Sequence, residues 1–264
     1  MSSTIERPAV RTMLNKVPEV TLYFWVVKIM ATTVGETAAD FLAERLHIGL
    51  TGTTVIMSAI LAVALTFQFG ADRYVPRVYW LAVVLISIVG TLITDNLTDN
   101  FGVSLWTTTT IFTIAMGVAF GVWYASERTL SIHEIDTTKR EAFYWSAILF
   151  TFALGTAAGD LISESLNLGY WKSALIFGAC IGLVSIGRFF LNFNAVLCFW
   201  VAYVITRPLG ASIGDFLSQK RADAGLGLGT TGTSAIFLVT ILILVTVMTL
   251  NARNTVELYA EDQT

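Results

Sequence analysis

Hydrophobic residues gather along this chain in eight blocks separated by short polar stretches. A helix that crosses a bilayer needs roughly 20 consecutive, mostly apolar residues, and each block is close to that length. The pattern therefore predicts eight transmembrane helices, with short connections that make consecutive helices antiparallel neighbours. The expected spans are approximately Leu22–Leu42, Thr53–Phe69, Val78–Thr94, Leu105–Tyr124, Ala142–Leu161, Ser173–Leu191, Val196–Leu217 and Thr231–Leu250.

The eight blocks form four copies of one sequence repeat, with two blocks in each copy. Each odd-numbered block carries a tryptophan, a glycine ten residues later and an aspartate five residues after the glycine. Successive copies begin 55, 65 and 55 residues apart, so each half of the chain is a duplicated pair. We expect an all-α membrane protein of four tandem helical hairpins, with the pseudosymmetry axis along the membrane normal. The copies are Trp25, Gly35 and Asp40; Trp80, Gly90 and Asp95; Trp145, Gly155 and Asp160; Trp200, Gly210 and Asp215.

The repeats divide the chain into five segments. A polar N-terminal segment, 1–20, precedes repeats 1 and 2 in 21–125. A charged linker, 126–141, leads to repeats 3 and 4 in 142–250, and a polar tail follows in 251–264. Ten lysines and arginines outside the spans lie on the side that holds both termini, against four on the other side. Because cytoplasmic loops carry the excess of positive charge, this distribution predicts cytoplasmic termini.

The three repeat positions have different physical roles. An indole near the start of a span suits the headgroup level, so the four tryptophans are predicted to be interfacial anchors. The glycines allow a second helix backbone to approach, and Gly155 with Gly159 extends this into a small-residue packing face. Gly117 with Gly121 and Gly178 with Gly182 predict the same kind of packing on even-numbered spans. Fifteen helical residues rise about 22 Å, which places each aspartate in the outer part of the bilayer.

Carboxylates recur on one face of the odd-numbered spans. Glu44, Asp99 and Glu164 follow their repeat aspartates by four residues, and Gln219 takes this place in the fourth repeat. An ionised group at the bilayer centre costs at least ~2.5–3.5 kcal/mol, so such groups are functional candidates. We predict that ions or protons bind to Glu36, Asp40, Asp95, Asp160 and Asp215, with Glu44, Asp99 and Glu164 as outer-mouth acids. Caps or interhelical hydrogen bonds are the structural alternative for the aspartates.

Two basic residues lie within the spans. Lys28 and Arg207 are expected to be internal counter-charges for the acids. Pro208 removes a backbone donor beside Arg207, which makes 207–210 a candidate hinge or site. Threonines at the starts of the even-numbered spans are either oxygen ligands for a hard cation or helix caps.

Other chemistry finds little support in the sequence. His47 and His133 are isolated, and Cys180 and Cys198 lie in apolar surroundings, so neither a histidine nor a cysteine metal site is expected. No nucleophile–base arrangement is recognisable, so we expect no enzyme and no cofactor. Only 13% of residues are charged, about half the share in soluble domains. The net charge of -3 argues against a nucleic-acid partner.

The four repeats resemble a bacterial membrane-protein family defined by a repeat of unknown function, with two spans and a shared tryptophan in each repeat. The resemblance covers about Tyr23 to Leu250 and rests on Trp25, Trp80, Trp145 and Trp200 with their glycines and aspartates. It implies a multi-pass protein of the bacterial cytoplasmic membrane and no particular activity. Residues 35–40 are also similar to acidic motifs of small repeated cation exchangers, although their order differs.

These patterns favour a secondary carrier or exchanger for a small cation. A divalent metal such as manganese is the expected substrate, with coupling to protons left open. The bilayer and the cation are then the partners, and a homo-oligomer is compatible with the sequence. The competing hypotheses are a structural or accessory membrane protein and a membrane enzyme that acts on a lipid or quinone.

Overall fold

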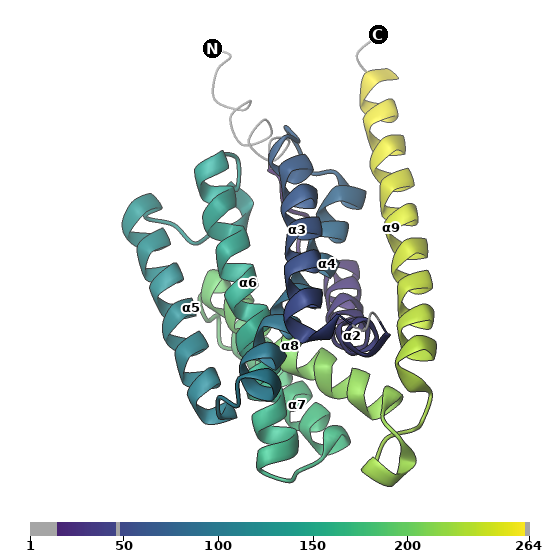
Figure 1. Ribbon diagram of the computed structural model, residues 1–264. Coiled ribbons are helices and arrows are strands. Elements are labelled where there is room, and N and C mark those ends of the chain that lie inside the picture. The colour runs from purple at the N-terminus through teal and green to yellow at the C-terminus, as the bar shows by residue number, and fades with distance from the viewer. Residues whose placement is uncertain (1–14, 46–47, 262–264) are drawn as a thin grey trace.

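The computed structural model describes residues 15–45 and 48–261, and these form eight long helices without strands. Two π-helical turns, η1 (Asn96–Asn100) and η3 (Leu161–Ser165), prolong the helices that they follow. This architecture confirms the all-α prediction. The long helices are α2 (Leu22–Arg45), α3 (Gly49–Phe69), α4 (Pro76–Asp95), α5 (Leu105–Glu127), α6 (Thr138–Asp160), α7 (Tyr170–Phe189), α8 (Ala195–Ser218) and α9 (Gly229–Glu261) (Figure 1).

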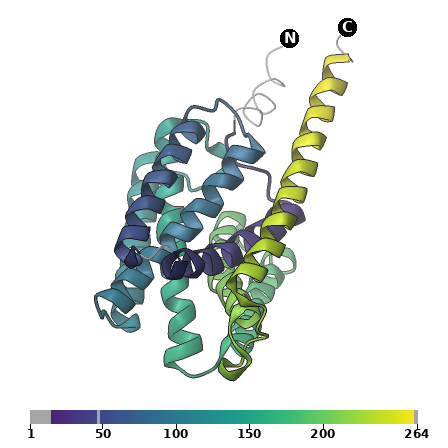
Figure 2. The ribbon, with the colours of Figure 1, turned by 45° about the vertical axis from the view of Figure 1, so that its right-hand side comes forward.

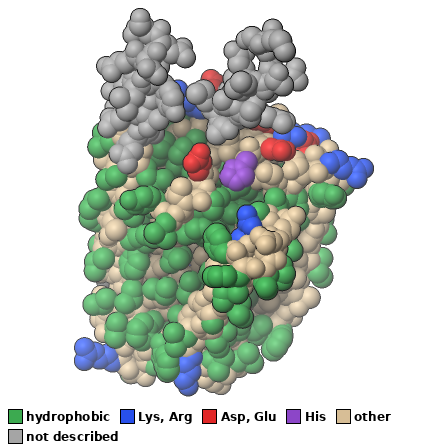
Figure 3. Space-filling view, turned by 180° about the vertical axis from the view of Figure 1, so that it is seen from behind, with side chains coloured by type: hydrophobic (Ala, Val, Ile, Leu, Met, Phe, Trp, Pro, Cys, Tyr) green, Lys and Arg blue, Asp and Glu red, His purple; other side chains and the backbone are tan. Residues whose placement is uncertain are grey.

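The surface of the bundle is suited to a membrane. Within the described residues, seven of the long helices are long and apolar enough to span a bilayer. The exception is α2, which carries Lys28, Glu36 and Asp40 within its length. Hydrophobic side chains cover the middle of the face in Figure 3, while charged side chains gather towards its two ends. The chain is therefore a multi-pass membrane protein.

The helices form an inner ring and an outer layer. The four helices that carry the repeat motif pack in a closed circle, in the order α2, α4, α6, α8 and back to α2. Each outer helix packs mainly on the inner helix of the next repeat: α3 on α4, α5 on α6, α7 on α8 and α9 on α2. Figure 2 shows α2 strongly inclined to α9, which it crosses. Consecutive helices are therefore close neighbours, as expected, where one repeat meets the next: α3 with α4, α5 with α6 and α7 with α8. The expectation is wrong for the two helices of one repeat, because each outer helix packs on the inner helix of the next repeat.

The repeat glycines hold the inner ring together. Each one faces the next inner helix, at the residue three positions before that helix's own repeat glycine. A Cβ added to Gly90 would lie 2.7 Å from the Phe152 Cβ and 3.2 Å from the Ala153 nitrogen. The predicted role in close packing is confirmed. The four contacts are Gly35 with Ser87, Gly90 with Phe152, Gly155 with Arg207, and Gly210 with Thr32.

The glycine pairs of the outer helices behave differently. A Cβ on Gly117, Gly121, Gly178 or Gly182 would meet no described atom within 4 Å. These positions face outward, because each outer helix contacts the ring along only one side. Their predicted contribution to helix packing is wrong for the single chain.

The repeat tryptophans also differ from the prediction of interfacial anchors. Trp80, Trp145 and Trp200 are at most 5% exposed, and only Trp25 is partly accessible. Inside the bundle, the Trp200 indole donates a hydrogen bond of 2.9 Å to the Leu130 carbonyl oxygen. Burial is possible because the indole nitrogen finds a partner within the protein.

Pro208 does not break its helix. It lies inside the continuous helix α8, and its ring packs against Gly155 and Gly159 of α6. The glycines leave room for the ring, so the helix is not broken at 207–210, which was predicted as a hinge or a site.

Candidate functional site: an acidic cavity closed by Arg207

A cavity of about 360 Å³ lies in the ring at the C-terminal ends of the inner helices. The first described residues and the C-terminal end of α9 lie at the opposite end of the bundle (Figure 1). Seven acidic side chains line the cavity, and no lysine or arginine is among its described lining residues. The acids are Glu36, Asp40, Asp95, Asp99, Asp160, Glu164 and Asp215.

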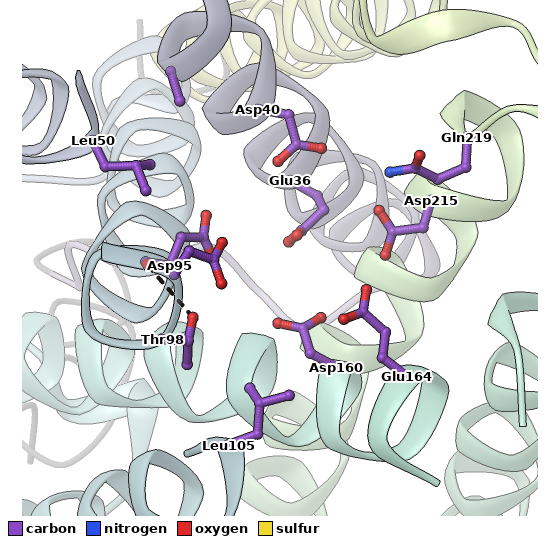
Figure 4. A pocket seen from close by; sticks show the side chains of 12 residues that line it. Glu36, Asp40, Leu50, Asp95, Thr98, Leu105, Asp160, Glu164, Asp215 and Gln219 are labelled. Carbon is purple, nitrogen blue, oxygen red and sulfur yellow. Dashed lines mark hydrogen bonds between the residues drawn. The ribbon is translucent and has the colours of Figure 1, made fainter. Parts of the chain in front are cut away.

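The repeat explains why these acids meet. Each inner helix brings its aspartate to the same level of the ring, and the acid four residues later lies on the same helix face. Asp99 and Glu164 are exposed at the mouth, whereas Asp215 is buried. In Figure 4 the carboxylates of Asp40, Asp160 and Asp215 point into one shared space. The sequence repeat thus becomes a ring of negative charge.

Three carboxylates approach closely enough to share one cation. Oxygen atoms of Glu36, Asp160 and Asp215 all lie within 4.8 Å of one another. They come from α2, α6 and α8, so three of the four repeats contribute. Hard divalent cations bind carboxylate oxygens at about 2.0–2.6 Å, and small movements of these side chains would bring three ligands to one ion.

The guanidinium of Arg207 closes the ring at the level of Glu36. Its Nη2 donates to Glu36 Oε2 at 2.8 Å and to Thr156 Oγ1 at 2.7 Å, and it also contacts the Thr91 hydroxyl. Its Nη1 donates to the Thr32 carbonyl oxygen at 3.0 Å. One arginine from the fourth repeat therefore binds side chains from all three other repeats. The guanidinium is fully buried, so these contacts replace the hydration of its two terminal nitrogens, while Nε has no partner among the described residues.

Lys28 lies in a separate, drier layer. Its ammonium is fully buried and has no hydrogen-bond partner among the described residues. It lies 4.1 Å from the ring centroid of Tyr203 and 4.4 Å from that of Phe152, which is cation–π geometry. The prediction that Lys28 is a counter-charge for the acids is wrong, because aromatic rings surround it instead.

Aromatic residues close the ring beyond Lys28. The hydroxyl oxygens of Tyr79 and Tyr144 are 2.5 Å apart, and both side chains are fully buried. Phe24 occupies the equivalent repeat position on α2 and is likewise buried. The cavity is therefore open at its acidic mouth and closed towards the other end of the bundle.

The structure brings together all the predicted acids whose side chains it describes. The side chain of Glu44 lies outside the described residues. Thr91 and Thr156 were missed by the sequence analysis, although they occupy the same repeat position as Glu36 on α4 and α6. Their shared repeat position could have identified them, because residues at equivalent positions of four repeats face one another when the repeats form a ring.

The threonines at the starts of the outer helices do not line the cavity. Thr53 and Thr54 donate to backbone carbonyls of their own helix, and the Ser104 hydroxyl caps α5. The oxygen-ligand interpretation is wrong for these threonines, because the outer helices contribute only Leu50 and Leu105 to the cavity within the described part of the chain.

The exposure of the cavity can be tested with cysteine substitutions. In a chain whose Cys180 and Cys198 are replaced by serine, Asp99→Cys is expected to react readily with a membrane-impermeant maleimide. Thr156→Cys, which lies beside Arg207 and is fully buried, is expected to react far more slowly. Mass spectrometry of the labelled chain measures both rates. Equal labelling of the two positions would contradict closure at Arg207.

A family model with the description Repeat of Unknown Function (DUF347) matches four segments of the chain: 23–74, 78–129, 143–192 and 198–254. The four matches coincide with the four repeats and together cover most of the sequence. No curated protein and no solved structure matches the chain.

Proposed function

Because the chain belongs to this family of repeats of unknown function, whose description assigns no activity, we propose a function from the geometry of the cavity: a secondary carrier for a small cation. The observation that carries the proposal is the cavity lined by seven carboxylates. A divalent metal ion such as Mn²⁺ is the proposed substrate, since carboxylate oxygens suit hard divalent cations.

Electrostatics favours a cation in this cavity over an anion or a neutral solute. Carboxylates a few ångströms apart repel one another, and each needs a counter-charge when water is scarce. Arg207 supplies one such charge through its ion pair with Glu36. Protons or a metal ion can supply the charge for Asp160 and Asp215, which converge with Glu36, so exchange of a metal ion for protons uses these same carboxylates.

Glu36 connects the cavity with its closure. One of its oxygens accepts from Arg207, while its carboxylate also lies within 4.8 Å of Asp160 and Asp215. A cation bound to these three acids competes with Arg207 for Glu36. In the proposed cycle, binding of the cation weakens the ion pair between Glu36 and Arg207. Movement of Arg207 then opens the ring towards the end of the bundle opposite the acidic mouth.

The location proposed for the protein is the bacterial cytoplasmic membrane, with both termini in the cytoplasm. The excess of lysine and arginine on the side of the termini supports this orientation. The acidic cavity then faces away from the cytoplasm, and the described arrangement corresponds to an outward-open carrier. In this proposal the chain moves an ion and carries out no covalent chemistry.

Uptake of Mn²⁺ into proteoliposomes tests the proposal. The full chain is reconstituted in vesicles that contain a Mn²⁺-sensitive dye. Asp160→Asn removes one of the three converging carboxylates and is expected to lower the uptake rate at least roughly tenfold, because loss of even an indirect metal-site contact has effects of that size. Ca²⁺, Mg²⁺ and Zn²⁺ are measured in parallel to rank the ions.

Asp72→Asn is the matched control, since Asp72 is exposed and lies outside the cavity. Its uptake rate is expected to equal that of the unchanged chain. If none of the four ions is transported and Asp160→Asn binds them as the unchanged chain does, the carrier proposal fails. The accessory-protein hypothesis then takes its place.

A further inference from the structure

A second cavity, of about 530 Å³, lies on the opposite side of the bundle from the acidic mouth. It is enclosed by the start of α2, the end of α7, the start of α8 and the segment 130–133. Its walls are mostly apolar, including Leu22, Trp25 and Phe199. Arg188 and His133 also line it, and no acidic side chain is among its described lining residues.

The duplication of the chain supplies a matched site for comparison. Trp25 and Trp145 are 120 residues apart, and the first two repeats align with the last two at this spacing. The alignment continues without a gap through the outer helices. Gly49, the first residue of α3, has a φ of 72°, and Gly169, just before α7, has a φ of 74°. Arg188 of α7 therefore corresponds to Gln68 of α3, which also lies 120 residues earlier.

In the first half of the chain, the carboxylate at this site is paired through both of its oxygens. The Gln68 amide donates to Glu141 Oε1 at 2.9 Å, and the Lys16 ammonium donates to Glu141 Oε2 at 2.9 Å. Lys16 also donates to the Phe69 carbonyl oxygen at 3.0 Å. All three charged or amide side chains are buried. Lys16, from the segment that precedes α2, thus neutralises the Glu141 carboxylate at this site.

In the second half, the carboxylate is missing. The residue that corresponds to Glu141 is Thr21, whose hydroxyl accepts a hydrogen bond of 3.3 Å from the Phe24 nitrogen and carries no charge. Arg188 replaces the neutral Gln68, but it forms no ion pair within the described part of the chain. The duplicated site has therefore gained a positive charge and lost the negative one.

Acids of the nearby linker do not compensate Arg188, because they already contact other basic residues. Glu127 pairs with both Lys139 and Arg140 at 2.9 Å. Glu134 and Asp136 lie 3.8 Å and 3.3 Å from the Arg140 guanidinium. Within the described residues, Arg188 thus has no acidic partner in an ion pair, and a bound anion can supply the negative charge.

We propose that this cavity binds an anionic phospholipid, with the phosphate on Arg188 and the hydrocarbon against the apolar wall. Guanidinium groups bind phosphate through two parallel hydrogen bonds, and basic pockets between membrane helices suit anionic headgroups. Phe189, which lines the cavity, and the next residue, Phe190, are 77% and 79% exposed, so apolar side chains lie on the surface beside Arg188. The apolar wall makes a lipid a better occupant than a free phosphate ion. This proposal does not depend on the cation carrier.

Native mass spectrometry of the purified full chain tests this site with phosphatidylglycerol and phosphatidylcholine as probes. The unchanged chain is expected to retain one phosphatidylglycerol more tightly than phosphatidylcholine. Arg188→Gln, which introduces the residue found at position 68, is expected to weaken that retention roughly tenfold, the effect of losing a charge-assisted hydrogen bond. Soluble glycerol phosphate at equal concentration is expected not to displace the lipid.

Arg128→Gln is the matched control, because Arg128 is exposed and does not line the cavity. It is expected to retain the lipid as the unchanged chain does. A second variant, Val196→Trp, fills the apolar wall and is expected to reduce retention while Arg188 is present. Equal retention of phosphatidylglycerol by the unchanged chain and Arg188→Gln, at equal thermal stability, overturns the proposal. Displacement by glycerol phosphate overturns the assignment to a lipid.

Discussion

Replacing Glu36 with glutamine is expected to lower the free energy of unfolding by about 3–5 kcal/mol, the usual effect of removing one partner from a buried ion pair. Glu36 is 5% exposed, and its Oε2 lies 2.8 Å from Arg207 Nη2. The glutamine amide oxygen can still accept a hydrogen bond, as can the Thr91 and Thr156 hydroxyls, but no negative charge then offsets the fully buried guanidinium. Unfolding of the purified chain in mixed detergent micelles, followed by circular dichroism, measures the change.

The double variant Glu36→Gln with Arg207→Gln separates the ion pair from the loss of a single side chain. Removing both charges leaves no unpaired ion, so the double variant is expected to be more stable than Glu36→Gln alone. Both variants are expected to lose cation transport, since both lack Glu36, the acid that lines the cavity and pairs with Arg207. If the single and double variants unfold alike, the ion pair does not govern the stability of the ring.

Gly90→Ala is expected to lower the free energy of unfolding by about 1–3 kcal/mol, the range observed for overpacked cores. The added methyl group would lie 2.7 Å from the Phe152 Cβ and 3.2 Å from the Ala153 backbone nitrogen. Backbone atoms cannot rotate away as a side chain can, so α4 and α6 must separate. The midpoint of thermal unfolding in detergent measures the effect.

Gly117→Ala provides the control for this substitution. Gly117 also lies within a long helix, but its added Cβ would meet no described atom within 4 Å. Alanine is a better helix former than glycine by about 1 kcal/mol, so this variant is expected to be as stable as the unchanged chain or slightly more stable. A loss of stability in Gly117→Ala as large as that in Gly90→Ala would show that the ring contact is not the cause.

The pseudosymmetry of the repeats also explains why a single arginine, Arg207, closes the ring of inner helices. Position 207 corresponds to Thr32, Ser87 and Phe152 in the other repeats, so the ring contains a single arginine at this level. Four arginines could not share the centre of one ring, because they would repel each other in a dry environment. Divergence of the repeats gave one helix the cation, a second helix the carboxylate of Glu36, and the remaining pair the hydroxyls of Thr91 and Thr156.

The aromatic layer shows where interpretation of single positions fails. A tryptophan near the start of a membrane helix is typical of the interface, and the sequence pattern of Trp80, Trp145 and Trp200 agrees with that role. In the ring, however, each of these indoles faces a neighbouring repeat. Contact between repeats therefore determines the environment of these residues more strongly than their depth does.

The sequence by itself determined the class of the protein, the number of long helices, the four-fold repeat and the acids that occupy equivalent places. These properties depend on local composition and on spacing along one helix, which are visible without any contact between helices. The tertiary structure alone decided which helix each outer helix covers, that Lys28 faces aromatic rings, and that Arg207 pairs with Glu36. The last two residues are 171 positions apart. Spacing shows that four equivalent faces exist, but only packing selects the neighbour that each face meets.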